Sequence, residues 1–258
     1  MCRDVSMIVM SDFSVRWSKV TGSHSEIIRE HHLCDTGLVN QARGEAPFVG
    51  IEIVPPEERY DTPGSEWVFS VDSGYAPILP PWWDAARAEE AVRAVLPQWI
   101  AECVVLPGQI RDTVYDGQRV YVSGGTIRHV YGGTIRHVYG GTIGRVSGGT
   151  VQSVSGGTIQ YVSGGTIWDV SGGTVQAVSG GTIWDVSGGT IQYVSGGTIQ
   201  CVSGGTIQYV YGGTIQSVSG DGTVILYEPI PKIHIEGRGV VLDRTGEAVR
   251  ARTASKPR

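Results

Sequence analysis

The chain has 258 residues, a formal net charge of −5 and 38 glycines, which is about twice the usual share of roughly 7%. This length allows one large domain or two small ones. The mild negative charge gives no electrostatic footprint of the kind that nucleic-acid binding requires. Four cysteines, at positions 2, 34, 103 and 201, lack the short paired spacings of metal ribbons or disulfide frameworks, and we interpret them as free thiols.

The first residues, MCRDVSMIVMSDFSVRW, contain one early arginine and only a broken apolar run. They predict neither a secretory signal nor a membrane-spanning segment. We therefore expect synthesis in the cytoplasm without a signal peptide. Met10 is an alternative start, and in that case the nine residues before it would not belong to the protein.

Residues 1–113 have ordinary mixed composition and predict a small N-terminal α+β domain that caps or docks the rest of the chain. Alternating apolar residues from Phe13 to Trp17 are typical of a half-buried strand. Further strands are expected at Val49–Val54, which Pro55 and Pro56 would end, and at Trp67–Val71.

Two helices are expected in this domain. Ser23 and Glu26 have the spacing of a capping box, so a short helix should run from there to about Leu33. Asp84 can cap a second helix, which Pro97 is expected to kink or end. Its apolar face consists of Ala88, Val92, Val95, Leu96 and Trp99.

From Val122 to Ser217 the chain repeats the octad V-[SY]-G-G-T-[IV]-x-x twelve times without a gap, and residues 114–121 are a degenerate copy. A short fixed period indicates units that bury their apolar side only by stacking, which predicts a mainly β fold with a β-solenoid over residues 114–222. Val at position one and Ile or Val at position six should face inward. The Gly-Gly pair permits the positive φ angles of a corner, Thr at position five should form a ladder, and the variable positions seven and eight should face outward.

The eight-residue period does not decide between two and three octads per turn of the solenoid. The residues substituted at the variable positions favour two. Trp168 and Trp184 are sixteen residues apart, as are Asp169 and Asp185. Tyr161, Tyr193 and Tyr209 also fall into one alternate class of octads. Two octads per turn at about 4.8 Å per turn give a rod of roughly 29 Å from the twelve copies.

The octad also fits V-x-G-x-x-x-x-x, as at Val122 with Gly124. In this it resembles the repeat of the membrane-piercing spikes of contractile-tailed phages and type VI secretion systems, in which three chains intertwine as a triangular β-prism. The resemblance implies a homotrimer as the alternative architecture, and a phage-derived, virion-associated protein. The S-G-G-T corners more weakly resemble adhesin autotransporter β-helices, and the segments EWVFSVD and PPWWD are similar to uncharacterised bacterial and prophage proteins that end in short tandem repeats.

Residues 223–258 predict a C-terminal β cap with a basic tail. Short strands are expected at Thr223–Tyr227, Lys232–Glu236, Val240–Asp243 and Glu247–Arg252. Such segments would cover the last open edge of the solenoid, because an uncovered edge invites end-to-end aggregation.

The candidate binding residues are side chains at positions seven and eight of the octads. Exposed aromatic ladders suit stacking on sugars or contact with protein, and the alternative is that the rings stack on one another and stiffen the rod. Arginines and histidines at the start of the rod form a basic patch that is either a polyanion-binding surface or a solubilising collar. The candidates are Tyr161, Trp168, Trp184, Tyr193, Tyr209, Arg128 and Arg136, and the patch also includes His129, His137 and Arg145.

We expect no cofactor, no metal site and no catalytic residue. No lysine follows the glycine pairs as in a phosphate-binding loop, and the octads hold only two aspartates, which is too few for a calcium-binding roll. The sequence His31-His32-Leu33-Cys34-Asp35 gathers side chains that bind metals. Adjacent histidines on a helix point about 100° apart, so they do not easily face one ion. A position at a helix C-terminus, where histidine interacts favourably with the helix dipole, explains them equally well.

Three hypotheses about function remain. The preferred one is a non-enzymatic structural or adhesive rod whose identical units multiply weak contacts to a protein or a surface glycan. The second is an intracellular solenoid that binds a host protein or nucleic acid, with protein favoured because the octads are close to neutral. The third is an enzyme with its site in residues 1–113, where no spacing of nucleophile, base and acid is evident.

Overall fold

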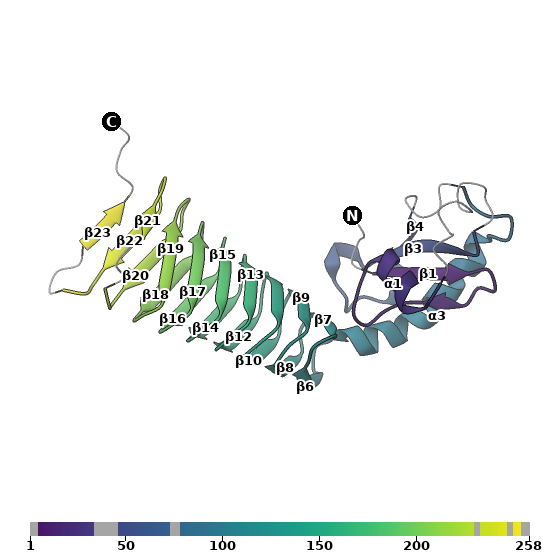
Figure 1. Ribbon diagram of the computed structural model, residues 1–258, viewed down its shortest axis with the longest axis horizontal. Coiled ribbons are helices and arrows are strands. Elements are labelled where there is room, and N and C mark those ends of the chain that lie inside the picture. Colours follow the sequence, from purple (N-terminus) through teal and green to yellow (C-terminus); the bar gives the residue numbers. More distant parts are fainter. Residues whose placement is uncertain (1–4, 34–45, 73–77, 230–232, 247–249, 254–258) are drawn as a thin grey trace. The chain divides into compact units, whose positions relative to one another are not determined.

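The computed structural model describes residues 5–33, 46–72, 78–229, 233–246 and 250–253. The chain divides into two compact units, residues 1–104 and 105–258 (Figure 1). None of the helices in the described ranges is long and apolar enough to cross a membrane.

The first unit contains an antiparallel sheet of four strands in the order β2-β1-β3-β4. The strands at β3 (Phe48–Val54) and β4 (Val68–Val71) confirm the sequence prediction. The strand expected from Phe13 shrinks to β2 (Val15–Arg16), because Phe13 has a φ of 62° that interrupts extended backbone.

Strand β1 (Ser6–Met10) was not predicted, and it lies in the interior of this sheet. Met7, Ile8 and Val9 have no exposed surface. A chain that began at Met10 would lack this strand and would leave β3 without one of its two partners. The broken apolar run at the start of the sequence is therefore the buried core of a sheet.

Helix α1 (His24–Glu30) begins after Ser23 as expected but ends before Leu33. The prediction of a capping box is wrong, because the Ser23 side chain makes no capping hydrogen bond to the helix backbone. Its Oγ lies 2.9 Å from the Oγ of Ser25, and Glu26 instead pairs with Arg29 at 3.3 Å.

The second helix, α3 (Ala85–Cys103), is capped by Asp84, whose carboxylate accepts a hydrogen bond from the backbone N–H of Arg87 at 3.1 Å. Pro97 was expected to kink or end the helix, and the second alternative is wrong, since the helix continues past it to Cys103. Pro97 is exposed, so its ring faces solvent rather than the apolar side. Two single-turn helices, η1 (Pro56–Glu58) and η2 (Gly64–Glu66), also lie in the described part of this unit.

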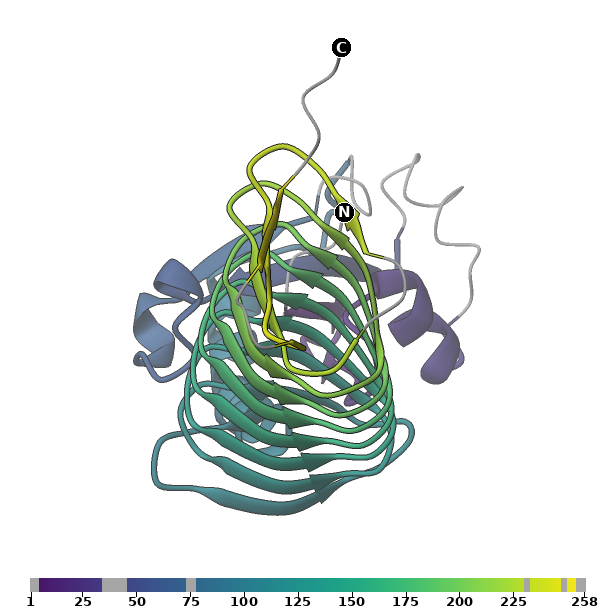
Figure 2. The same cartoon turned by 90° about the vertical axis from the view of Figure 1, so that its left-hand side faces the viewer.

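The second unit is a β-solenoid of two sheets whose strands alternate along the chain, and Figure 2 shows its turns as stacked, flattened loops. The ten-stranded sheet contains β6 (Ile110–Val114), β8 (Thr126–Val130), β10 (Thr142–Val146), β12 (Thr158–Val162), β14 (Thr174–Val178), β16 (Thr190–Val194), β18 (Thr206–Val210), β20 (Thr223–Leu226), β22 (Val240–Asp243) and β23 (Arg250–Thr253). The nine-stranded sheet contains β5 (Val104–Val105), β7 (Arg119–Val122), β9 (Thr134–Val138), β11 (Thr150–Val154), β13 (Thr166–Val170), β15 (Thr182–Val186), β17 (Thr198–Val202), β19 (Thr214–Val218) and β21 (His234–Ile235).

The pairing confirms two octads per turn. From β8 to β19, each strand pairs in parallel with the strand sixteen residues further along the same chain, as Thr142 does with Thr158 and Ile143 with Ile159. One chain therefore supplies both strands of every turn, which is the single-chain arrangement and not the intertwined prism. Nine parallel strands in each sheet make nine turns, or about 43 Å at about 4.8 Å per turn.

The octad places two aliphatic side chains of every strand in the core. In β12, Ile159 and Val162 are at most 1% exposed, whereas Gln160 and Tyr161 between them face solvent. Because two consecutive residues face outward, the strand departs from strict alternation, and positions six and one both point inward. The resulting core is one continuous column of Val, Ile and Leu side chains. Thr at position five pairs with Thr on the neighbouring rungs, which confirms the expected ladder.

The two glycines of the Gly156-Gly157 corner are required for different reasons. At Gly157 the φ angle is 70°, which side chains disfavour, and the second glycine has a positive φ in every octad from Gly133 to Gly213, whereas the first glycine does not. At Gly156 the φ angle is ordinary, but a Cβ there would lie 2.3 Å from the carbonyl oxygen of Tyr139 on the turn below. The prediction of positive φ is therefore right for the second glycine and wrong for the first, which is instead fixed by the closeness of successive turns.

The parallel pairing extends beyond the octads at both ends. Strand β6 pairs with β8, and β20 and β22 continue the stack into the tail, so segments expected as a cap are further turns of the solenoid. Among the described strands of the solenoid, β23 alone is antiparallel, and it lies on the outer edge of β22. Arg252 of β23 pairs with Asp243, and the hydrogen bonds from the Thr245 hydroxyl and backbone N–H, with this arginine, lower the pKa of the Asp243 carboxyl.

Candidate functional site

The outward positions of the octads form vertical columns on the two sheets. Residues sixteen apart occupy the same place on adjacent strands, which lie about 4.8 Å apart. The strands of consecutive octads belong to different sheets, so each sheet displays the outward residues of every second octad. Any candidate binding surface is therefore a set of residues at intervals of sixteen, not a run along the sequence.

Trp168 and Trp184 form a stacked pair on the nine-stranded sheet. Their ring centroids are 5.6 Å apart, with 12° between the ring planes. The two residues remain 53% and 47% exposed, respectively, which is unusual for so large an apolar side chain. The sequence prediction that both rings face outward is confirmed. We call these rings, together with Asp169 and Asp185, the tryptophan platform.

The two carboxylates lie beside the indole pair. Asp169 and Asp185 are directly paired across β13 and β15. Each accepts a hydrogen bond from a serine hydroxyl of the next turn, at 2.7 Å from Ser187 to Asp169 and 2.9 Å from Ser203 to Asp185. The platform thus combines apolar ring faces with fixed hydrogen-bond acceptors, an arrangement that can hold a hydroxylated ring.

The three candidate tyrosines lie on the ten-stranded sheet, but they do not form one ladder. Tyr193 and Tyr209 stack with centroids 5.0 Å apart, and Tyr227 continues the column at 5.3 Å. Ala177 separates Tyr161 from Tyr193 in the register of the sheet. Tyr161 is instead adjacent to Arg145, whose guanidinium lies 5.8 Å from the ring centroid. The rings thus do stack on one another, as the alternative expected, while half of the Tyr193 surface remains open.

The basic patch expected at the start of the rod is divided between the two sheets. Arg128 lies on β8 of the ten-stranded sheet, whereas Arg136 lies on β9 of the nine-stranded sheet. The two candidate arginines are eight residues apart, so they face opposite sides of the solenoid and do not make one surface. Arg128 pairs with Asp112 on the preceding rung at 2.6 Å.

A hollow opens on the ten-stranded sheet where position seven is glycine. Gly144 stands between Arg128 and Gln160 in this column, and without a side chain it leaves an open space of about 380 Å³. We call it the arginine hollow; its lining residues are Thr126, Arg128, His129, Thr142, Gly144, Arg145, Gln160 and Tyr161. The hollow was not predicted from the sequence, although a signal was present. Of the twelve octads, only the one that contains Gly144 has glycine at position seven.

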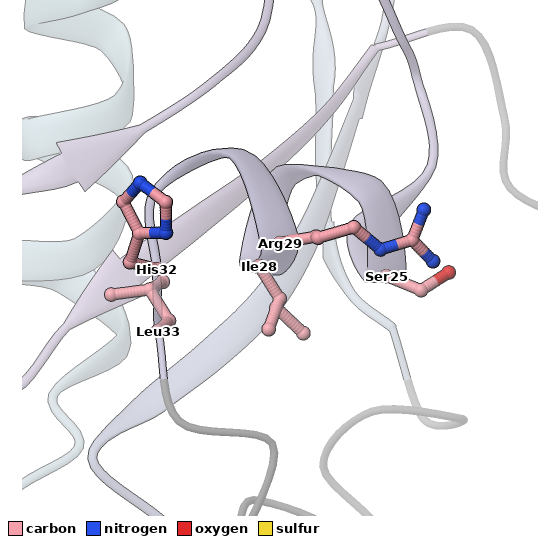
Figure 3. Close-up of a pocket in the computed structure, with 5 residues that line it drawn as sticks. All are labelled: Ser25, Ile28, Arg29, His32 and Leu33. Carbon is pink, nitrogen blue, oxygen red and sulfur yellow. The ribbon is translucent and has the colours of Figure 1, made fainter.

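The first unit carries a second hollow of about 380 Å³, lined by Ser25, Ile28, Arg29, His32 and Leu33 (Figure 3). All five residues come from α1 and the residues that follow it. The adjacent histidines do not converge, because His32 lines this hollow whereas the His31 Nε2 lies 3.0 Å from the carbonyl oxygen of Trp17. Cys34 and Asp35, the other members of the suspected metal group, lie outside the described residues.

An Asp–His pair in the first unit has a structural role. The fully buried His24 has its Nδ1 3.0 Å from the Asp72 carboxylate and its Nε2 2.9 Å from the carbonyl oxygen of Ile51. Because both ring nitrogens contact protein acceptors and no ring atom reaches solvent, the imidazole holds α1 against β3.

Within the described residues, no three His, Cys, Asp or Glu side chains gather in a way that could hold a metal ion. Comparisons of the chain with protein families, with curated proteins and with solved structures found no match.

Proposed function

We propose that the protein is a non-enzymatic adhesive rod that displays ligand-binding columns on a rigid solenoid. One observation carries the proposal: inward positions are almost constant along the rod, whereas outward positions hold half-exposed aromatic rings in register, above all Trp168 and Trp184. A rod needed only for length has no use for exposed indoles, which cost solubility. Repetition adds avidity when several rods or several ligand units are present.

We propose a surface glycan as the ligand of the tryptophan platform. A sugar ring can stack its apolar C–H face on an indole, and its hydroxyls can donate hydrogen bonds to the adjacent Asp169 and Asp185. The same two carboxylates repel phosphate, which opposes nucleic acid as the ligand. Protein is the other class of partner that this surface suits.

We base a proposal for the origin of the rod on the octad sequence. The V-x-G pattern resembles that of phage tail spikes, and this supports a phage-derived, virion-associated protein. Since one chain closes each turn here, a homotrimer of this protein would be an association of complete rods rather than an intertwined prism.

The test replaces the platform and measures binding to glycans. Trp168→Ala/Trp184→Ala should lower affinity for the bound polysaccharide at least about tenfold, because the exposed indoles supply the contact area. Binding is measured on an array of bacterial surface polysaccharides, with the unmodified rod used first to find the ligand.

The matched control is Gln200→Ala/Gln216→Ala, which changes the same outward position on the same sheet, two rungs further on. This variant should retain at least half of the affinity if the platform is the site. Equal losses in both variants, or no binding of the unmodified rod to any glycan, would contradict the proposal.

A further inference from the structure

We infer that the arginine hollow is a second binding site, on the opposite sheet from the tryptophan platform, and that it takes a sugar bearing a carboxylate. The inference does not depend on the proposed function of the platform. It rests on three properties of the hollow: the missing side chain at Gly144, the kind of side chains that surround it, and their net charge.

The hollow exists because one side chain is missing from a filled column. The neighbouring rungs place Arg128 and Gln160 at the same strand position, and Gly144 between them contributes no atom beyond its Cα. A Cβ at this glycine would lie 2.6 Å from the carbonyl oxygen of Arg128. The volume of about 380 Å³ falls within the roughly 300–1,000 Å³ of small-molecule sites.

The lining supplies the groups that an acidic sugar needs. Two guanidiniums, from Arg128 and Arg145, line the hollow, and that of Arg145 can hold a carboxylate through paired N–H donors. The Tyr161 ring, 53% exposed, offers an apolar face for the sugar ring. The hydroxyls of Thr126 and Thr142 add donors and acceptors for sugar hydroxyls.

The charge balance leaves one cation for the ligand. The lining contains no carboxylate. Arg128 shares its charge with Asp112 at 2.6 Å, at a position where both side chains are more than half exposed. In the described part of the chain no carboxylate pairs with Arg145, whose guanidinium lies over the Tyr161 ring. A single carboxylate placed in the hollow would therefore neutralise Arg145, whereas a neutral sugar would leave that charge uncompensated.

The probe is a galacturonic acid oligosaccharide, with the same oligosaccharide methyl-esterified as the neutral comparison. Isothermal titration of the full chain at 0.15 M NaCl should show the acid binding at least about tenfold more tightly than the ester, the size expected for a charge-assisted pair. Inorganic sulfate and dextran sulfate distinguish this from general attraction of anions, and they should bind more weakly than the acidic oligosaccharide.

Two variants locate the site. Gly144→Gln should abolish binding by filling the hollow, and Arg145→Gln should reduce it at least about tenfold while leaving the backbone unchanged. Arg145→Gln keeps the test valid if the glutamine at 144 disturbs folding, which thermal unfolding followed by circular dichroism would detect. Gln176→Ala, two rungs from Gly144 in the same column, should bind as the unmodified chain does.

Trp168→Ala/Trp184→Ala should also keep full affinity for the acidic oligosaccharide, since the platform lies on the other sheet. This result separates the failure of one proposal from the failure of the other. The inference is overturned if acid and ester bind alike, if dextran sulfate binds as tightly, if Arg145→Gln retains affinity, or if nothing binds.

Discussion

Gly157→Ala is expected to destabilise the centre of the solenoid by about 3–5 kcal/mol. The new side chain would have to adopt a φ of 70°, and its Cβ would lie 2.6 Å from the carbonyl oxygen of Gly141. The atoms that this Cβ would meet belong to the backbone of Gly140 and Gly141 and not to a flexible side chain, so the turn below must move. Because solenoid turns contact only their neighbours, hydrogen exchange should quicken mainly in β10, β12 and β14.

Two other glycines separate backbone strain from collision. Gly117 has a φ of 75° but no atom near the position of a Cβ, so Gly117→Ala should cost only about 1–2 kcal/mol. Gly246 has neither constraint, and Gly246→Ala should change the free energy of unfolding by no more than about 0.5 kcal/mol. Denaturant unfolding should therefore rank the loss of unfolding free energy as Gly157→Ala, then Gly117→Ala, then Gly246→Ala. Any other order would contradict the role given to the corner glycines.

Val175→Asp should cost about 3–5 kcal/mol, because it places an unpaired carboxylate in the aliphatic column. Val175 has no exposed surface, and the residues of its core cluster are all Val, Ile or Leu, with no polar partner to offer. The loss should appear as a lower midpoint of chemical denaturation and as faster hydrogen exchange in β12, β14 and β16.

The matched control is the next residue of the same strand. Gln176 faces outward beside other glutamines, so Gln176→Asp should stay within about 0.5 kcal/mol of the unmodified chain. Comparable losses for both substitutions would mean that the inward and outward positions of the octad have been assigned wrongly.

The solenoid was predictable because each octad carries the whole instruction for one strand and one corner. The substitutions even revealed the number of octads per turn, since Trp168 and Trp184 stack only if sixteen residues complete a turn. The extent of the rod was not predictable, because β6, β20 and β22 keep the inward valines and leucines while losing the Gly-Gly-Thr pattern. Stacking on a finished turn supplies what their own sequence lacks.

The N-terminal unit was harder to predict, because its elements depend on tertiary contacts. The buried run Ser6–Met10 has no alternation, since both faces of an interior strand are covered. The helix passes Pro97 because this proline faces solvent and the apolar side of α3 remains packed on both sides of it. The Ser23 hydroxyl found a serine partner in place of the helix backbone.

The candidate surfaces were predictable residue by residue but not as groups. Positions seven and eight were correctly placed outside, yet Arg128 and Arg136 were joined into one patch because they are close in sequence. The period of sixteen separates them and instead brings Arg128, Gly144 and Gln160 together. A glycine that removes a side chain gives a weaker sequence signal than a residue that adds one.

The most direct test of this account joins positions sixteen residues apart by cysteine cross-linking. In a chain whose native cysteines are replaced by alanine, Ala177→Cys/Tyr193→Cys places two thiols on paired residues of β14 and β16. Their Cα atoms should be about 4.8 Å apart, within the 4.4–6.8 Å range of disulfides. The control, Ala177→Cys/Asp185→Cys, is eight residues apart and spans opposite sheets.

We predict that the first pair oxidises within one chain and runs as a monomer on a denaturing gel, and that the control pair stays reduced. Cross-linked dimers or trimers from the first pair would instead show that neighbouring rungs come from different chains. That result, or a disulfide in the control, would contradict a solenoid in which one chain closes each turn with two octads.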